Sequence, residues 1–250
     1  MTATAIEAVV FDLDDTLFLQ ETWLAGAWSA VADAAPEGVD RDALHDALRS
    51  IAAEGSDRGR IIDRALEMIG ADAVDAGPLV VAFRGHAPVR LRVADGADAL
   101  LRLSRTIGPI GLVTDGDPQI QRAKLAALGL TARFDAILLS DELGRSHRKP
   151  HPAPFLAVAA ALGVDPGGCV YVGDRPEKDV AGPAAAGYLG AVRVRTGEHA
   201  LQPDLPCLAS VADLEEAARW LSCRAEAATT VRRARPAGGE HASTPSPAGA

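Results

Sequence analysis

The chain has 250 residues, of which 48% are hydrophobic and only 4% are aromatic, and its formal net charge is −9. This length allows one sizeable domain, or a core domain with a modest insertion, and the apolar content excludes a globally disordered chain. The negative charge argues against nucleic acid as a partner, because phosphate backbones attract basic surfaces.

Signals for disulfides, zinc, secretion or membrane insertion are weak. The three cysteines, Cys169, Cys207 and Cys223, show no CxxC spacing, which favours inert thiols over a disulfide framework or a zinc site. No charged segment followed by a long apolar stretch opens the chain, and no apolar run approaches the roughly 18 residues that span a membrane. We expect a soluble cytoplasmic protein without a membrane partner, and no pattern specifies an oligomeric state.

The first apolar run, Ala8–Phe11, stops at acidic residues and predicts a fully buried strand. Asp12 and Asp14 follow this strand directly, two residues apart. Paired acids at such an edge suit metal binding, acid–base chemistry or both. Aspartate is also a favoured N-cap residue, so this pair alone is equally consistent with a helix cap.

The residues from Leu17 to Arg92 show helical periodicity and no convincing strand. Four helices are predicted in this stretch, at Trp23–Ala34, Arg41–Ala53, Arg60–Ile69 and Gly77–Gly85. We interpret residues 17–92 as a helical insertion placed immediately after the first strand. Open α/β sheets bind ligands at the carboxyl ends of their strands, so this insertion is a candidate lid.

Several side chains of the insertion invite a functional interpretation. Trp23 and Trp28 lie in a helical setting and are predicted to pack the core of the insertion rather than to touch a ligand. Basic side chains in helices are more often solvated than ligand-bound, although some here could face a second anionic group of a substrate. These basic residues are Arg58, Arg60, Arg84, His86 and Arg90.

After a helix predicted at Asp95–Ser104, short apolar runs alternate with helical segments. The predicted strands are Ile110–Val113, Ala136–Leu139, Val170–Val172 and Ala191–Val194, and the predicted helices are Gln119–Leu128, Pro152–Leu162 and Asp179–Ala186. Strands that alternate with helices indicate βαβ units and therefore a parallel sheet covered on both faces. The predicted fold class is α/β.

Polar residues follow two of these later strands. Thr114, Asp115 and Gly116 form a glycine turn whose hydroxyl and backbone N–H groups can hold phosphate oxygens. Asp174 follows another buried strand, and Asp179 stands at the start of the next predicted helix. Hard oxygen ligands at a strand tip suit Mg²⁺. A simple tight turn at Gly116 and a helix cap at Asp179 are the alternative interpretations.

Lys149 stands before Pro150 and belongs to a rare residue type in this chain. Only three of the 25 lysines and arginines are lysines, and the other two are Lys124 and Lys178. A lysine supplies a compact charge that can neutralise a carboxylate and a phosphoryl oxygen together. A solvated surface lysine is the alternative interpretation.

The residues from Arg224 onward form a segment of different composition. This segment is rich in arginine, proline, glycine, serine and alanine and offers little that could bury a core. It is predicted to be a disordered tail covering residues 224–250. A basic anchoring role is possible on charge, but a passive tail is favoured by composition.

Taken together, the polar residues resemble the motifs of the haloacid dehalogenase-like hydrolase superfamily. The run Asp12-Leu13-Asp14-Asp15-Thr16 is similar to its first motif, Thr114 to its second, Lys149 to its third, and Asp174 with Asp179 to its fourth. The resemblance extends over residues 6–221. It implies a Rossmann-like parallel-sheet core at residues 1–16 and 93–223 with an inserted helical cap domain at residues 17–92.

The same resemblance implies a mechanism for the acidic residues. Asp12 would attack phosphorus and become an aspartyl-phosphate, which divides one difficult displacement into two easier steps. Asp14 would protonate the leaving alcohol and then activate the hydrolytic water. Mg²⁺ would be held by Asp12, the backbone carbonyl of Asp14 and Asp174, with Asp179 supporting the site.

The phosphoryl group has its own predicted binding residues. The resemblance implies that Thr114, Asp115 and Lys149 hold this group while it is transferred. Asp115 departs from the family pattern, which often carries asparagine there. Its backbone role would survive this change, but its charge is less favourable to phosphate.

The resemblance also limits the reaction class. Family dehalogenases lack an acid two residues after the nucleophile, so Asp14 favours phosphoryl transfer over carbon–halogen cleavage. Phosphonate-cleaving members use a cap lysine, and residues 17–92 contain none. We expect a Mg²⁺-dependent phosphatase of a small phosphorylated metabolite. A sugar-phosphate phosphomutase is the alternative, and a haloacid dehalogenase or a non-catalytic binding module is less favoured.

Overall fold

The computed structural model describes residues 5–55, 59–88 and 90–234 of the chain. Its centre is a six-stranded sheet in the order β3-β2-β1-β4-β5-β6, in which every pair of neighbours is parallel. The strands are β1 (Ala8–Phe11), β2 (Ile110–Thr114), β3 (Ala136–Leu139), β4 (Cys169–Gly173), β5 (Gly190–Val194) and β6 (Ala209–Val211). The predicted α/β fold is confirmed. The strand β6 was not predicted, since three residues with an exposed serine at the centre carry no strand pattern.

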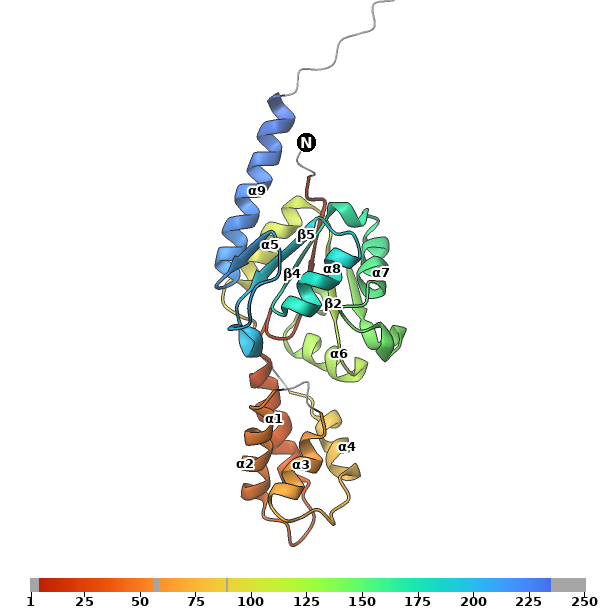
Figure 1. Cartoon of the computed structure of the whole chain (residues 1–250), viewed down its shortest axis with the longest axis vertical. Coiled ribbons are helices and arrows are strands. Elements are labelled where there is room, and N and C mark those ends of the chain that lie inside the picture. Colours follow the sequence, from red (N-terminus) through yellow and green to blue (C-terminus); the bar gives the residue numbers. More distant parts are fainter. Residues whose placement is uncertain (1–4, 56–58, 89, 235–250) are drawn as a thin grey trace, which may run out of the picture.

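Helices cover both faces of this sheet (Figure 1). In β1, Val9 and Phe11 pack into the cluster that includes residues of α5 (Ala97–Ile107), α6 (Pro118–Ala127) and α9 (Leu214–Ala234). Ala8 and Val10 point to the opposite face, where α7 (Ala153–Leu162) contributes Phe155 and Val158. Alternation along a strand places side chains on both faces, and burial of both faces requires the continuous apolar run that the sequence shows.

Four helices lie between β1 and α5 in the described part of the chain, where four helices were predicted, and we call them the helical unit. They are α1 (Gln20–Asp33), α2 (Arg41–Ala52), α3 (Ile61–Met68) and α4 (Gly77–Gly85). The unit has its own apolar cluster, to which Trp28, Leu48 and Leu79 belong. Trp23 on the same α1 instead joins the cluster of the sheet. Figure 1 shows the unit beyond the carboxyl ends of the strands.

The predicted disordered tail is wrong for its first part, because α9 continues to Ala234. Residues 224–228 are arginine, alanine and glutamate, which are strong helix formers and extend a helix that Leu214 and Leu221 already anchor. Residues 235–250 of the predicted tail lie outside the described part of the chain. No described helix is both long and apolar enough to cross a bilayer.

The segment after β4 also differs from the single helix predicted at Asp179–Ala186. A π-helical turn, Pro176–Val180, comes first and is followed by the short α8 (Ala181–Ala185). Proline is tolerated only in the first turn of an α-helix. A regular helix that contains Pro183 must therefore begin within one turn before this residue.

Gly173 ends β4 and lies directly beneath a carboxylate. A Cβ atom at this position would stand 2.6 Å from the Cβ and Cγ atoms of Asp179. The Oδ2 atom of Asp179 accepts hydrogen bonds from the backbone N–H groups of Asp174 at 3.1 Å and Arg175 at 3.0 Å. The glycine therefore allows this carboxylate to fold back over the strand end.

This close approach predicts a stability loss for Gly173→Ala. The methyl group must displace Asp179, so we expect the free energy of unfolding to fall by about 1–3 kcal/mol in urea denaturation. Gly85→Ala is the matched control, because nothing lies within 4 Å of its added Cβ. Its free energy of unfolding should stay within about 0.5 kcal/mol of wild type or rise slightly. Equal stability of both variants would contradict the packing argument.

Candidate active site

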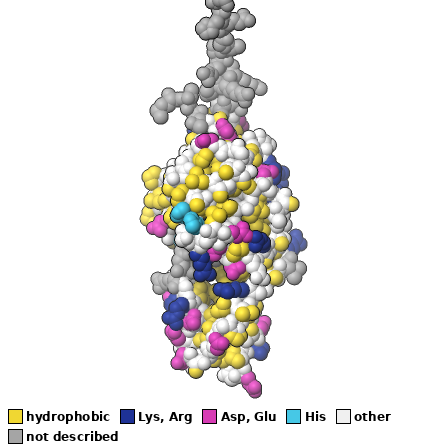
Figure 2. Space-filling model, turned by 90° about the vertical axis from the view of Figure 1, so that its right-hand side faces the viewer, with side chains coloured by type: hydrophobic (Ala, Val, Ile, Leu, Met, Phe, Trp, Pro, Cys, Tyr) yellow, Lys and Arg dark blue, Asp and Glu magenta, His cyan; other side chains and the backbone are white. Residues whose placement is uncertain are grey.

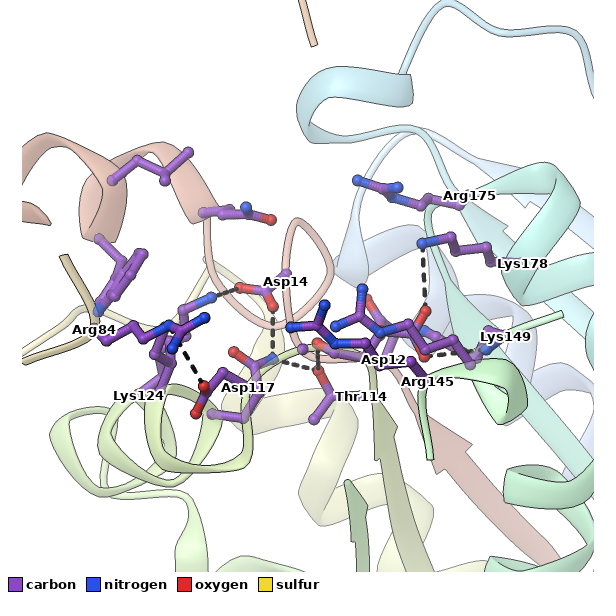
Figure 3. A pocket seen from close by; sticks show the side chains of 18 of the residues that line it. Asp12, Asp14, Arg84, Thr114, Asp117, Lys124, Arg145, Lys149, Arg175 and Lys178 are labelled. Atoms are coloured by element: carbon purple, nitrogen blue, oxygen red, sulfur yellow. Dashed lines mark hydrogen bonds and ion pairs between the residues drawn. The ribbon is translucent and has the colours of Figure 1, made fainter. Parts of the chain in front are cut away.

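A pocket of about 370 Å³ opens between the carboxyl edge of the sheet and the helical unit. Figure 2 shows basic and acidic side chains gathered at the waist of the molecule between these two parts. Parallel strands all end at this edge, so residues that follow different strands meet there. Five of the residues predicted from the sequence line the pocket, namely Asp12, Asp14, Thr114, Asp115 and Lys149. Figure 3 labels four of them, Asp12, Asp14, Thr114 and Lys149.

The ammonium group of Lys149 joins three parts of the site. Its Nζ atom lies 2.5 Å from Oδ1 of Asp12 and 2.7 Å from Oδ1 of Asp179, and it also donates to the hydroxyl of Tyr171 at 3.2 Å. The lysine side chain is only 3% exposed. Burial opposes its charge, but the carboxylates of Asp12 and Asp179 outweigh this and hold the pKa of Lys149 well above its usual value. Lys149 is therefore a cation.

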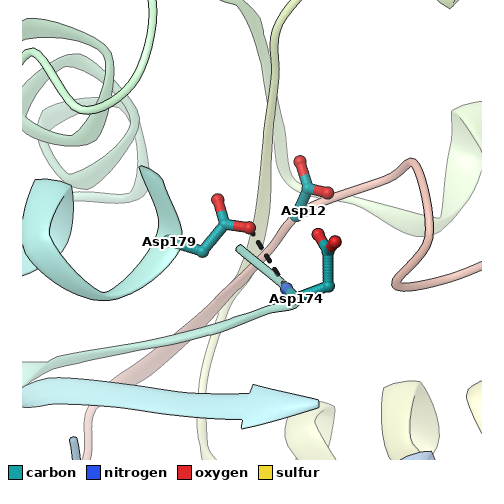
Figure 4. Close-up of side chains that lie close together, drawn as sticks. All are labelled: Asp12, Asp174 and Asp179. Atoms are coloured by element: carbon teal, nitrogen blue, oxygen red, sulfur yellow. Dashed lines mark hydrogen bonds between the residues drawn. The ribbon is translucent and has the colours of Figure 1, made fainter. Parts of the chain in front are cut away.

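Three carboxylates, those of Asp12, Asp174 and Asp179, form a buried cluster behind the pocket (Figure 4). Each contributes an oxygen atom, and these atoms lie within 4.8 Å of one another. Burial raises the pKa of Asp12 to about 7, against the opposing charge of Lys149. Burial and the charges of Asp179 and Asp12 raise the pKa of Asp174 to about 10.

The donor set of this cluster fits a divalent cation. Both carboxyl oxygens of Asp174 are buried and accept no hydrogen bond from the described residues. Buried carboxylates are normally paired or metal-bound, and Mg²⁺ prefers a few such oxygens. The two oxygens of Asp179, in contrast, are occupied by Lys149 and by backbone N–H groups.

Asp14 occupies the side of the pocket that faces the helical unit. Its Oδ1 atom lies 2.6 Å from Nζ of Lys124, and its Oδ2 atom accepts a hydrogen bond of 2.7 Å from Nε2 of Gln121. The same Nε2 atom donates to Oγ1 of Thr114 at 2.5 Å. The two carboxylates at the end of β1 thus have different cations as partners, and both α6 side chains were missed by the sequence analysis. The rarity of lysine was the available signal for Lys124.

Asp115 directs its carboxylate into the protein. Its Oδ1 atom accepts hydrogen bonds from the hydroxyl of Ser140 at 2.6 Å and from the backbone N–H of Lys149 at 3.1 Å, while Oδ2 lies 3.3 Å from Nζ of Lys178. Burial opposes ionisation, but Lys149, Ser140 and Lys178 together lower the pKa of Asp115. The negative charge that was expected to disfavour phosphate is therefore compensated by neighbouring cations.

Basic side chains surround the pocket of this acidic protein. All three lysines of the chain line it, together with Arg84, Arg145, Arg148 and Arg175. Arg84 comes from α4 and lies 4.0 Å from Asp117.

Of the other basic residues considered in the insertion, those that the structure describes do not line this pocket. Arg60 pairs with Glu67, His86 packs on the ring of Trp23, Arg90 is exposed, and Arg58 lies outside the described residues. Trp23 itself lines the pocket, contrary to the expectation that it packs only within the insertion.

The chain is similar to several known phosphatases and to a dehalogenase structure. A glyceraldehyde 3-phosphate phosphatase from Methanopyrus kandleri is 35% identical over 203 residues, which cover 78% of this chain and 86% of that protein. A phosphoserine phosphatase from Thermus thermophilus is 36% identical over 171 residues, which cover 68% of this chain and 67% of that protein. The structure of a 2-haloacid dehalogenase from Pseudomonas syringae shares 26% identity and a TM-score of 0.59, covering 87% of this chain and 99% of that one.

The family assignment rests on a match that includes most of the sheet. Residues 6–187, from just before β1 to just after α8, match the model of the haloacid dehalogenase-like hydrolases. The first three motif positions, at Asp12, Thr114 and Lys149, and the fourth at Asp174 all fall inside this span. The chain belongs to the haloacid dehalogenase-like hydrolase family.

Proposed function

We propose that this hydrolase is a Mg²⁺-dependent phosphatase that cleaves a small phosphorylated metabolite through an aspartyl-phosphate on Asp12. The observation that carries the proposal is the pair of carboxylates in one pocket. Asp12 is buried beside Lys149, whereas the side chain of Asp14 is 18% exposed and faces the helical unit. Two carboxylates in different environments suit two different roles. An alcohol leaving group needs a proton and a halide does not, so Asp14 supports phosphate-ester cleavage.

The reaction has two displacement steps. In the first, an oxygen of Asp12 forms a bond to phosphorus while the bond to the leaving oxygen breaks, and Asp14 gives that oxygen its proton. In the second, Asp14 takes a proton from a water molecule whose oxygen attacks the same phosphorus. The bond to Asp12 then breaks, and inorganic phosphate leaves with both side chains restored.

The remaining residues of the site are proposed to bind the phosphoryl group and the metal ion. Thr114, the backbone at Asp115 and Lys149 bind the phosphoryl oxygens. Asp12, Asp174 and the backbone carbonyl of Asp14 would hold Mg²⁺, with Asp179 orienting the turn after β4. When bound, Mg²⁺ supplies the positive charge that lets the nucleophile and the phosphate approach each other.

The helical unit is proposed to act as the cap over this site, within the insertion 17–92. It contributes Trp23, Leu24 and Phe83 to the side of the pocket that the leaving group would occupy. A pocket of about 370 Å³ accommodates a phosphate and a leaving group of a few carbons, in keeping with a small substrate.

The nucleophile assignment is tested with Asp12→Asn. An amide cannot form the aspartyl-phosphate, so release of phosphate from p-nitrophenyl phosphate with Mg²⁺ should fall by about 10³-fold or more. Asp165→Asn is the matched control, because Asp165 is exposed, lies outside the pocket, and caps the turn at Gly167 in a way that asparagine also can. Its rate should stay within about twofold of wild type. A substantial rate in Asp12→Asn would refute the assignment.

The metal site is tested with Asp174→Asn by thermal denaturation. A cation that binds only the folded protein stabilises it by about 2.7 kcal/mol at 100 times its Kd, so Mg²⁺ should raise the Tm of the wild type. The amide should largely abolish this rise, because it removes the carboxylate that lacks other partners. Asp165→Asn should respond as the wild type does. Equal Mg²⁺ stabilisation of Asp174→Asn would show that the ion binds elsewhere, whatever the activity.

A further inference from the structure

The carboxylate of Asp14 is held by two side chains that no motif assigns. Lys124 and Gln121 stand one turn apart on α6, so they present their polar groups to the same place. Lys124 binds one oxygen of Asp14 at 2.6 Å, and Gln121 binds the other at 2.7 Å. The orientation of this carboxylate is therefore set from α6 and not only by its own loop.

Lys124 lies in a setting where its charge needs compensation. The residue is 3% exposed, and its ammonium group stands 4.7 Å from the centre of the Trp23 ring and 5.7 Å from that of Phe18. A buried lysine is destabilising unless an anion or aromatic faces replace its water. Asp14 supplies the anion, and Figure 3 shows its carboxylate beside Lys124. The ion pair and the two rings together fix the ammonium group in one position.

Gln121 connects this arrangement to the phosphate side of the pocket. Its Nε2 atom donates to Asp14 and also to the hydroxyl of Thr114, the last residue of β2. Gln121 is 2% exposed, so its side-chain amide has little freedom to turn. Asp14 is thus tied by one side chain to the group proposed to bind phosphoryl oxygens and by another to a tryptophan of the helical unit.

From these contacts we infer that Lys124 is a positioning residue, which aims the carboxylate of Asp14 at the leaving-group oxygen of the substrate. This inference rests on the proposed phosphatase function. Proton transfer requires a heavy-atom distance of about 2.6–3.2 Å, and a displacement of about 1 Å can lower the rate 100-fold. Because Trp23 belongs to α1, the packing of the helical unit contributes to the orientation of the Asp14 carboxylate.

The test compares two aryl phosphates that differ in the need of their leaving group for a proton. Nitrophenolate leaves p-nitrophenyl phosphate without help, whereas phenol leaves phenyl phosphate far more readily when it is protonated. Lys124→Met keeps the apolar stem against Trp23 but removes the ammonium group. We expect kcat/KM to fall about 10–100-fold for phenyl phosphate and less than about threefold for p-nitrophenyl phosphate.

Two further variants distinguish a positioning role of Lys124 from a nonspecific loss of activity. Lys178→Met removes another pocket lysine, one that pairs with Asp115 on the phosphate side, and should lower kcat/KM equally for both esters. Lys124→Arg retains a cation and should recover part of the loss on phenyl phosphate. Urea denaturation of each variant checks that the folded state is populated, and Lys124→Arg carries the test if Lys124→Met does not fold.

The outcomes are distinct. An equal loss on both esters in the Lys124 variants, or no loss on either, overturns the positioning role while the wild type remains an active phosphatase. If the wild type releases phosphate from neither ester with Mg²⁺, the proposed function fails, and the inference fails with it. A selective loss on phenyl phosphate, partly restored by arginine, supports the role.

Discussion

One buried positive charge organises the carboxyl edge of the sheet. The ammonium group of Lys149 contacts Asp12 at the end of β1, Asp179 in the turn after β4, and Tyr171 within β4. Removal of one partner of a buried ion pair commonly costs about 3–5 kcal/mol, because the other charge stays uncompensated. The same contact that completes the candidate site therefore also holds together segments that are far apart in the chain, and site and fold depend on each other here.

The two carboxylates that follow β1 are controlled by different parts of the protein. Asp12 is fixed by Lys149, from the segment between β3 and α7, and by its own backbone N–H, which donates to the carbonyl of Val172 in β4 at 2.9 Å. Asp14 is held by α6, and its partner Lys124 packs against Trp23 of the helical unit. The proposed nucleophile benefits from a rigid setting, whereas the proposed proton donor must match the substrate that the helical unit is proposed to cover. The separate contacts of Asp12 and Asp14 correspond to these two proposed roles.

Much of the fold and most of the candidate site could be predicted because buried parallel strands carry a strong local pattern. Ala8–Phe11 was found with its observed bounds, and the acids beyond it were expected at the sheet edge. Ala209–Val211 is too short to show such a pattern, and the helical Arg224–Ala234 was obscured by the composition of the residues after it. Gln121 and Lys124 escaped prediction because helix residues give no strand-end signal. Their contacts depend on how α6 packs against the loop after β1, which is a tertiary property.

The place of β1 in the sheet has a consequence for synthesis on the ribosome. Val10 pairs with Gly111 of β2 on one side and with Tyr171 of β4 on the other. At about 5–20 residues per second, translation reaches β4 roughly 10–30 s after β1 has been made. Until β2 has been made, this entirely apolar strand lacks both neighbours, and until β4 has been made it still lacks one. The helical unit, with its own apolar cluster, has all of its residues before β2 is made. The strand β1 is thus a segment that a chaperone acting on the nascent chain is expected to bind.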